Sequence, residues 1–134
     1  MQFTKAEEYG LIGMIYLARQ PRGAVVSLGE ISRAEKIPDK FLAKIFQNLT
    51  RTGIVKSHRG VRGGFSLAKT PRKVSMGEVI QSIQGNGEVM KCAFQKKTCN
   101  RLERCPIRGI VLDASLQMLT VYNRHSLKEL ADTF

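Results

Sequence analysis

Two short amphipathic segments joined by a tight turn constrain the fold of this chain more than any other feature. The first, residues 27–35, opens with Ser27-x-x-Glu30, a spacing that caps a helix N-terminus. The second, residues 38–52, starts with Pro38, which suits the first position of a helix, and Gly53 follows as a C-terminal cap. Its apolar face is predicted to hold Phe41, Leu42, Ile45, Phe46 and Leu49, and its other surface Lys40, Lys44, Gln47, Asn48 and Arg51. This pattern predicts a helix-turn-helix.

A glycine-rich hairpin is predicted directly after these segments. Residues 54–58 and 65–68 have the composition of two short strands around Arg59-Gly60-Val61-Arg62-Gly63-Gly64. Glycines let a backbone approach a duplex closely, and arginine suits phosphates or a narrow minor groove. The tip lacks the G-x-x-x-x-G-K-[ST] pattern of a phosphate-binding loop. After a helix-turn-helix, such a hairpin is typical of the wing of a winged helix.

The other predicted elements are helices, so the expected fold class is mainly α. Residues 4–19 carry apolar side chains on two sides, which predicts contact with the chain's own core and with a partner. Ser75-x-x-Glu78 and Ser126-x-x-Glu129 predict two more capped helices. A long helix is predicted from Pro106, with a stripe at spacings of four and three formed by Ile107, Val111, Ala114, Met118 and Val121.

The long helix is expected to make a dimer. A chain of 134 residues does not need a second long apolar stripe to close one small core, so a two-fold partner helix is its economical use. An intramolecular core helix is the alternative. The expected organisation is a winged helix-turn-helix DNA-binding domain in residues 1–83, a cysteine-containing loop in residues 84–106, and a dimerisation helix with a short terminal helix in residues 107–134.

The charge of the chain favours polyanionic partners. The formal net charge is +11 at pH 7 and the pI is about 10.0. Residues 1–80 hold 14 Lys and Arg against 6 Asp and Glu, so most of the excess coincides with the winged helix. Nucleic acid is the first expectation and an anionic membrane surface the second. No apolar run approaches the roughly 18 residues of a membrane span, so we expect a cytoplasmic protein that does not enter a membrane.

Three cysteines lie in a polar, basic segment. Cys92, Cys99 and Cys105 are separated by six and then five residues, among Lys96, Lys97, Arg101 and Arg104. The odd number and the absence of a signal-peptide pattern disfavour disulfides. Thiolates bind zinc and iron-sulfur clusters, although the tight C-x-x-C pairs of zinc fingers and ferredoxins are missing. Metal or cluster ligation is therefore the favoured interpretation, and three unrelated thiols are the alternative.

Taken together, these pieces resemble the IscR and NsrR group of winged-helix bacterial regulators. The resemblance covers nearly the whole chain: MQFTKAEEYG, SLGEISRAEKIPDKFLAKIFQNLTRTGIV, SHRGVRGGFSLA, SMGEVIQSI and the three cysteines. It implies a homodimer that binds double-stranded DNA at a pseudo-palindromic operator. It also implies an iron-sulfur cluster, [2Fe-2S] or [4Fe-4S], on Cys92, Cys99 and Cys105. Loss, oxidation or nitrosylation of this cluster is expected to change DNA affinity.

At the position of the fourth cluster ligand, this chain differs from some members of the group. Relatives like IscR have a histidine three residues after the third cysteine, and here that position is Arg108, which cannot ligate. Relatives like NsrR use a carboxylate from the first helix of the other subunit, and the matching position is Glu8. Open alternatives are Glu7, Glu103, Asn100 and a solvent molecule. In the first turn of a helix, Glu7 and Glu8 also complement the helix dipole.

DNA contacts are expected on the second helix of the motif and on the wing. The resemblance implies major-groove contacts from the helix that starts at Pro38 and a minor-groove or backbone contact from Arg59. Charge and exposure point to Lys40 and Lys44. The full expected set is Ser27, Pro38, Asp39, Lys40, Phe41, Lys44, Arg51, Arg59 and Arg62.

The predicted function is a homodimeric, sequence-specific transcriptional regulator whose DNA affinity is controlled by an iron-sulfur cluster that senses iron, redox state or nitric oxide. The alternative is a regulator of the same fold that uses its cysteines as a cluster-free thiol-redox switch or as a zinc site. No pattern pairs a nucleophile with a base, and His58 and His125 fall in the wing and near the terminal helix, so an enzyme is not expected.

Overall fold

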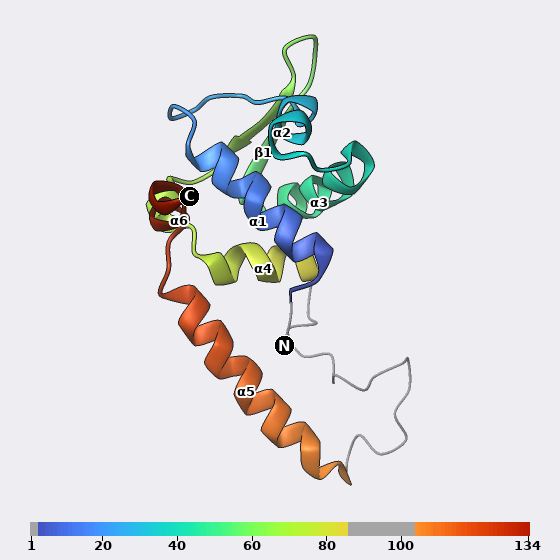
Figure 1. Ribbon diagram of the computed structural model, residues 1–134, viewed down its shortest axis with the longest axis vertical. Helices are drawn as coiled ribbons and strands as arrows, with labels where there is room; N and C mark the ends of the chain where they lie inside the picture. Colours follow the sequence, from blue (N-terminus) through green and yellow to red (C-terminus); the bar gives the residue numbers. More distant parts are fainter. Residues whose placement is uncertain (1–2, 86–103) are drawn as a thin grey trace.

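The computed structural model describes residues 3–85 and 104–134. Figure 1 shows a compact body of helices with a β-hairpin, from which one long helix projects. This architecture is the mainly α winged helix that the sequence predicts. In chain order the elements are α1 (Lys5–Ala18), α2 (Leu28–Glu35), α3 (Asp39–Arg51), β1 (Val55–His58), β2 (Gly64–Leu67), the 3-10 helix η1 (Pro71–Lys73), α4 (Met76–Gln84), α5 (Pro106–Asn123) and α6 (Leu127–Thr133).

Capping side chains set the starts of the helices. The Thr4 hydroxyl accepts a hydrogen bond from the Glu7 backbone N–H at 3.2 Å, and a carboxylate oxygen of Glu7 accepts from the Thr4 N–H at 2.7 Å. Ser126 and Glu129 form the same reciprocal box at α6. Pro38 lies one position earlier than expected, at the N-cap of α3, with its backbone in an extended conformation. It therefore precedes the helix instead of forming its first residue.

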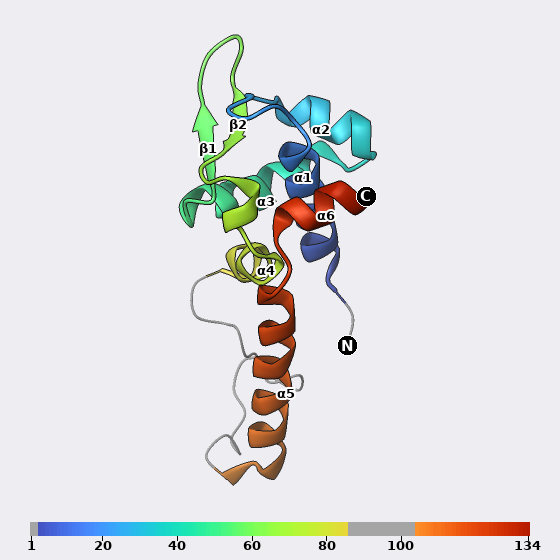
Figure 2. The same ribbon diagram turned by 90° about the vertical axis from the view of Figure 1, so that its left-hand side faces the viewer.

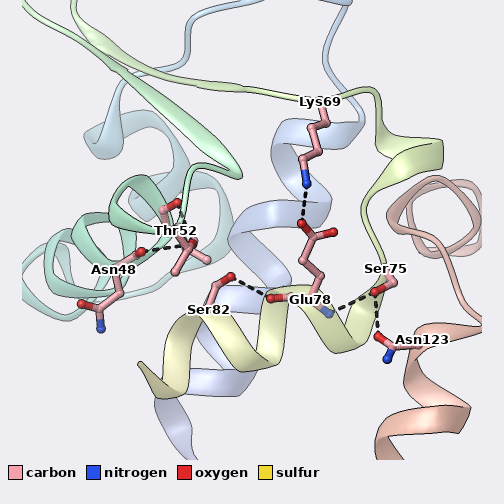
Figure 3. A network of polar contacts seen from close by, with 8 residues as sticks. Asn48, Thr52, Lys69, Ser75, Glu78, Ser82 and Asn123 are labelled. Atoms are coloured by element: carbon pink, nitrogen blue, oxygen red, sulfur yellow. Dashed lines mark hydrogen bonds and ion pairs between the residues drawn. The ribbon is translucent and has the colours of Figure 1, made fainter. Parts of the chain in front are cut away.

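Two of the predicted capping boxes are only half formed. Ser27 and Ser75 each accept from the backbone N–H three residues on, as expected. The carboxylate of Glu30, however, accepts from the Tyr16 hydroxyl at 2.9 Å, and this hydrogen bond raises the pKa of Tyr16 above its ordinary value. The carboxylate of Glu78 pairs with Lys69 at 2.7 Å (Figure 3). In both cases the carboxylate bonds to a donor elsewhere in the chain, and the reciprocal half of the box is absent.

The core is a single cluster centred on α1. Its fully buried members include Met14, Ile31, Leu42, Phe46, Leu49, Ile54, Val55, Val74, Val79 and Leu127. α1 contacts α2, α3, α4 and α6, so the same chain covers both of its apolar sides. The two-sided pattern of this helix therefore does not require the partner contact that the sequence suggested.

Small residues bring three helices close together. A Cβ atom at Gly10 of α1 would lie 2.3 Å from Ile83 Cδ1 of α4 and 3.1 Å from Ile45 Cγ2 of α3. A Cβ at Gly13 would lie 2.9 Å from Cε2 of the fully buried Phe46 ring. These glycines allow α1 to pack directly on α3 and α4.

The two strands form an antiparallel hairpin in which Val55 pairs with Leu67 and His58 pairs with Gly64. A single bridge adds Val26 to this hairpin, because Val26 exchanges two backbone hydrogen bonds with Phe65, at 2.9 and 2.8 Å. The Phe65 ring packs edge-on against Phe46 of α3, with 4.9 Å between the ring centroids. These contacts fasten the hairpin to the helix-turn-helix.

The C-terminal part of the chain returns to the body. α6 packs against α1, and Leu127 is fully buried there. At the junction, the Ser75 hydroxyl donates to Asn123 Oδ1 at 2.9 Å, which joins the end of α5 to the start of α4 (Figure 3). No helix in the described part of the chain combines the length and the apolar composition that a membrane span needs.

Candidate nucleic-acid interface and cluster ligands

One face of α3 is polar, basic and exposed. Lys40, Lys44, Gln47 and Arg51 are all exposed at spacings of four, three and four residues, which places them on one stripe of the helix. The opposite side is held in the core by Leu42, Ile45, Phe46 and Leu49, each 3% exposed or less. Among the described residues, none of these three cations lies within ion-pair distance of a carboxylate. The stripe is therefore available to an anionic partner.

The turn between α2 and α3 sets the position of this stripe. Lys36 ends α2 in the left-handed conformation, with φ at 54°, and the buried Ile37 anchors the turn in the core. Pro38 and Asp39 are exposed at the start of α3, and Ser27 is exposed at the start of α2. The N-terminal ends of two helices thus carry three of the expected DNA contacts, where backbone N–H groups favour phosphate.

The burial that the sequence predicts for Phe41 is wrong. Its side chain is 53% exposed and packs edge-on against Tyr9 of α1, with ring centroids 6.1 Å apart. Phe41 lies a quarter turn away from the basic stripe because successive helical residues differ by about 100°. Its role as a DNA contact stays a prediction.

The tip of the hairpin is a tight turn built on glycine. The Gly63 backbone N–H donates to Gly60 O at 2.9 Å, and Gly60 has a φ of 108°. A Cβ at Gly63 would lie 2.5 Å from His58 O, and a Cβ at Gly64 would lie 2.2 Å from Val26 O. Only glycine fits these two close approaches. The expected contacts Arg59 and Arg62 are both exposed at this tip.

The hairpin and α3 belong to one packed unit. Figures 1 and 2 both show the hairpin extending beyond α2, away from α5. Its base is tied to the residue before the α2 cap through Val26 and to α3 through the Phe46–Phe65 contact. The structure therefore brings the arginines of the tip and the basic stripe of α3 onto one rigid frame.

Two of the three cysteines, Cys92 and Cys99, lie outside the described residues, as do Asn100 and Glu103. Cys105 lies half-buried at the N-cap of α5, and the exposed Arg108 follows three residues later. Within residues 3–85 and 104–134, no three His, Cys, Asp or Glu side chains converge on a common point.

The adjacent carboxylates Glu7 and Glu8 have different surroundings. Glu7 is 6% exposed, and its second oxygen accepts a hydrogen bond from Gln84 Nε2 at 2.6 Å. Both oxygens of Glu7 are thus occupied. The Glu8 side chain is 45% exposed and contacts Lys5 Nζ at 2.9 Å. The hydrogen bond to Glu8 raises the pKa of Lys5 above its ordinary value. Of these two carboxylates, Glu8 is the one with accessible oxygens.

Within one chain, Glu8 and Cys105 lie far apart. Glu8 lies in the first turn of α1, and Cys105 directly precedes α5. α5 has 18 residues, so it is about 27 Å long. Figures 1 and 2 show its N-terminal end at the far end of the molecule from α1.

α5 carries an exposed apolar face. Ile107, Ile110 and Val121 are 46%, 71% and 49% exposed, and no residue of α5 is fully buried. An open depression of about 560 Å³ runs along this face, lined by Ile110, Asp113, Ala114, Gln117, Met118, Val121 and Tyr122. Ile110 is the most exposed large apolar residue of the helix, and the spacing of the predicted stripe did not include it.

The comparisons with known proteins agree with this architecture. The Rrf2 family, described as an iron-dependent transcriptional regulator, matches residues 3–133. The transcriptional regulator NsrR of Shouchella clausii is 29% identical over 131 residues, which are 97% of this chain and 88% of that protein. The structure of CymR, the global cysteine regulator of B. subtilis, has a TM-score of 0.73 and 25% identity, with 100% of this chain and 98% of that chain covered.

The structure of T. potens IscR has the same fold, with a TM-score of 0.75, 22% identity, and 99% of this chain and 88% of that chain covered. The family match extends over nearly the whole chain, including the helix-turn-helix, the hairpin and α5. The chain therefore belongs to the Rrf2 family of transcriptional regulators.

Proposed function

We propose that this protein is a homodimeric, sequence-specific DNA-binding regulator whose affinity for DNA is controlled by an iron-sulfur cluster. The observation that carries the DNA-binding part is the shared frame of α3 and the hairpin, with Lys40, Lys44 and Arg51 on one and Arg59 and Arg62 on the other. Five cations on one rigid frame suit the phosphates and groove edges of a duplex.

The two parts of this frame have different roles. The α3 stripe enters the major groove, where Lys40, Lys44 and Gln47 are long enough to reach base edges. Ser27, Pro38 and Asp39 lie at helix N-termini, where the backbone N–H groups bind phosphate and fix the register. Arg59 and Arg62 enter the adjacent minor groove. Phe41, beside the stripe, contacts a thymine methyl group or the sugar backbone.

The exposed face of α5 supports a two-fold dimer. A face with side chains such as Ile110, 71% exposed, is costly to leave in water, and a second copy of the same helix covers it. A two-fold pair of winged helices requires half-sites about 34 Å apart, one turn of the duplex. The operator is therefore a pseudo-palindrome.

The donor set fits an iron-sulfur cluster. Cys92, Cys99 and Cys105 supply thiolates, and Glu8 has an accessible carboxylate while both oxygens of Glu7 are occupied. An iron-sulfur cluster supplies a centre that gains or loses electrons and reacts with nitric oxide. The separation between α1 and the start of α5 within one chain favours a Glu8 donated by the second copy.

Ligation of this kind links the two copies. Glu8 lies on α1, the helix at the centre of the core, and α1 contacts both α3 and α4. A carboxylate that binds across the dimer therefore sets the distance between the two α3 helices. A hard oxygen ligand among thiolates is readily displaced, which suits a sensor.

A cluster-free thiol-redox switch or a zinc-bound regulator of the same fold is the second candidate. Arg108, which cannot ligate, occupies the position of a possible fourth ligand. CymR of B. subtilis, named as a cysteine regulator, has a similar structure, so the fold alone does not identify the signal.

The DNA-binding part is tested by selecting sequences from a random pool of duplexes with the purified protein. The selected duplex is then titrated at several salt concentrations. We expect a pseudo-palindromic sequence and a steep loss of affinity with salt, because phosphate contacts release counterions. Weak binding that is the same for all sequences would overturn the proposal.

A further inference from the structure

Val61 stands alone at the tip of the hairpin. Its side chain is 107% exposed, the highest value among the large apolar side chains of the described residues. It is one of the two central residues of the turn closed by the Gly63 N–H and Gly60 O. Turns favour glycine, asparagine, aspartate and proline at such positions, and valine has no advantage there.

The surroundings of Val61 show no structural role for it. The glycines at positions 60, 63 and 64 place no side chains before and after the two central residues of the turn. Two of these glycines, Gly63 and Gly64, are required by close contacts. The other side chains at the tip are those of Arg59 and Arg62, both exposed. The hairpin thus presents one rigid apolar side chain between two cations, because a β-branched side chain is stiff about χ1.

A narrow groove with negative potential is the partner that suits such a tip. The minor groove of B-DNA is about 6 Å wide, and where it narrows its potential attracts arginine. Proteins that bind there combine arginine with apolar side chains that contact sugars and base steps. A turn whose remaining residues are glycines, apart from the two arginines that such a groove attracts, is slim enough to enter.

We propose that Val61 is a specificity-determining residue that disfavours G·C pairs under the hairpin. This inference rests on the proposed DNA-binding function. The floor of the minor groove differs between base pairs in one group, the guanine 2-amino group, which projects into the groove as a hydrogen-bond donor. The methyl groups of valine cannot accept that hydrogen bond and cover the donor, so a G·C pair leaves it unsatisfied.

Three versions of the selected duplex test the inference. Footprinting first maps the base pairs that the hairpin protects. At these positions one duplex carries A·T pairs, the second G·C pairs and the third inosine·C pairs. Inosine lacks the 2-amino group but keeps the major-groove edge of guanine. We expect the unmodified protein to bind the A·T and inosine·C duplexes with similar affinity, and the G·C duplex about tenfold more weakly.

The matched variants are Val61→Thr, which keeps the shape and adds a hydroxyl, and Val25→Thr, at a second exposed valine outside the hairpin. Val61→Thr is expected to reduce the difference between inosine·C and G·C to threefold or less, since the hydroxyl accepts from the 2-amino group. Its salt slope stays unchanged because no charge is removed. Val25→Thr keeps the tenfold difference.

Two results overturn the inference while the proposed function stands: equal affinity of the unmodified protein for inosine·C and G·C, or a Val61→Thr variant that discriminates as the unmodified protein does. If the unmodified protein selects no sequence at all, the proposed function fails and the inference fails with it.

Discussion

The buried carboxylate of Glu7 accepts a hydrogen bond from Gln84 Nε2 at 2.6 Å, across 77 positions of the chain. This contact joins the first turn of α1 to the last turn of α4. Close by, Asn48 of α3 donates to Ile83 O at 3.4 Å, and Ile83 fits against Gly10. α1, α3 and α4 therefore meet at the end of α4, just before the cysteine-bearing part of the chain.

Replacing Glu7 by Gln is expected to lower the free energy of unfolding by about 1–3 kcal/mol. The two Glu7 oxygens accept from Thr4 N–H and Gln84 Nε2, and a glutamine places an N–H group against one of these donors. Urea denaturation of the metal-free protein at one fixed concentration measures the change. Glu8→Gln is the control, with an expected change within about 0.5 kcal/mol, because its carboxylate is exposed. If both variants lose the same free energy of unfolding, the buried Glu7–Gln84 contact contributes no more to stability than the exposed Glu8 carboxylate.

Replacing Gly64 by Ala is expected to destabilise the hairpin and to weaken DNA binding. The new Cβ would lie 2.2 Å from the backbone oxygen of Val26, so the Val26–Phe65 bridge has to shift. Overpacking of this kind costs about 1–3 kcal/mol. In Gly109→Ala, on α5, the new Cβ meets no atom within 4 Å. This variant is expected to raise the free energy of unfolding by up to about 1 kcal/mol, since alanine is the better helix former. Thermal unfolding measures the loss of stability expected for Gly64→Ala and the gain expected for Gly109→Ala. A stable Gly64→Ala protein with normal DNA affinity would contradict the role of the Val26–Phe65 bridge in anchoring the hairpin.

Replacing Lys44 by Gln is expected to weaken operator binding about tenfold at physiological salt. It should also reduce the salt slope by about 1.8, because the dimer loses one phosphate contact in each of its two copies. Lys44 lies at the centre of the exposed α3 stripe. Lys128→Gln, on α6, removes the same charge at a site where Lys128 already pairs with Asp132. Fluorescence anisotropy at several salt concentrations measures both. If the two variants lose affinity equally, net charge and not the α3 stripe determines binding.

Replacing Ile110 by Glu is expected to dissociate the dimer, because it places a charge in the exposed apolar face of α5. Thr120→Glu adds the same charge on a different side of the same helix and should leave the dimer intact. Sedimentation velocity over a range of concentrations separates monomer from dimer. A dimeric Ile110→Glu protein would mean that copies associate through another surface.

Much of the fold could be predicted because local signals mark the ends of its elements. Prolines and Ser-x-x-Glu spacings set the helix starts to within about one residue, and the glycine-rich tip set the hairpin. The partners of Glu30 and Glu78 could not be predicted, because Tyr16 and Lys69 reach them only after the helices have packed. The exposure of Phe41 has the same origin, since its neighbour Tyr9 is distant in sequence.

The candidate site shows the same division. Glu7 and Glu8 have the same chemistry in the same helical turn, and only the arrival of Gln84 from α4 buries one and leaves the other accessible. The apolar stripe of α5 predicted an interface, but which of its residues face the body depends on how α5 packs against α4. Ile110 was missed for that reason. Cys92 and Cys99 lie outside the described residues, so their role as ligands stays a prediction.

The most direct test of the account measures iron, acid-labile sulfide and operator affinity on protein purified without oxygen, before and after removal of the metal. We predict stoichiometric iron and sulfide, a visible absorption spectrum typical of a cluster, and an operator affinity that changes by tenfold or more when the cluster is removed. The Glu8→Ala protein should lose its iron faster than the unmodified protein. Bound zinc, or no metal, with the same operator affinity in both preparations would contradict cluster control.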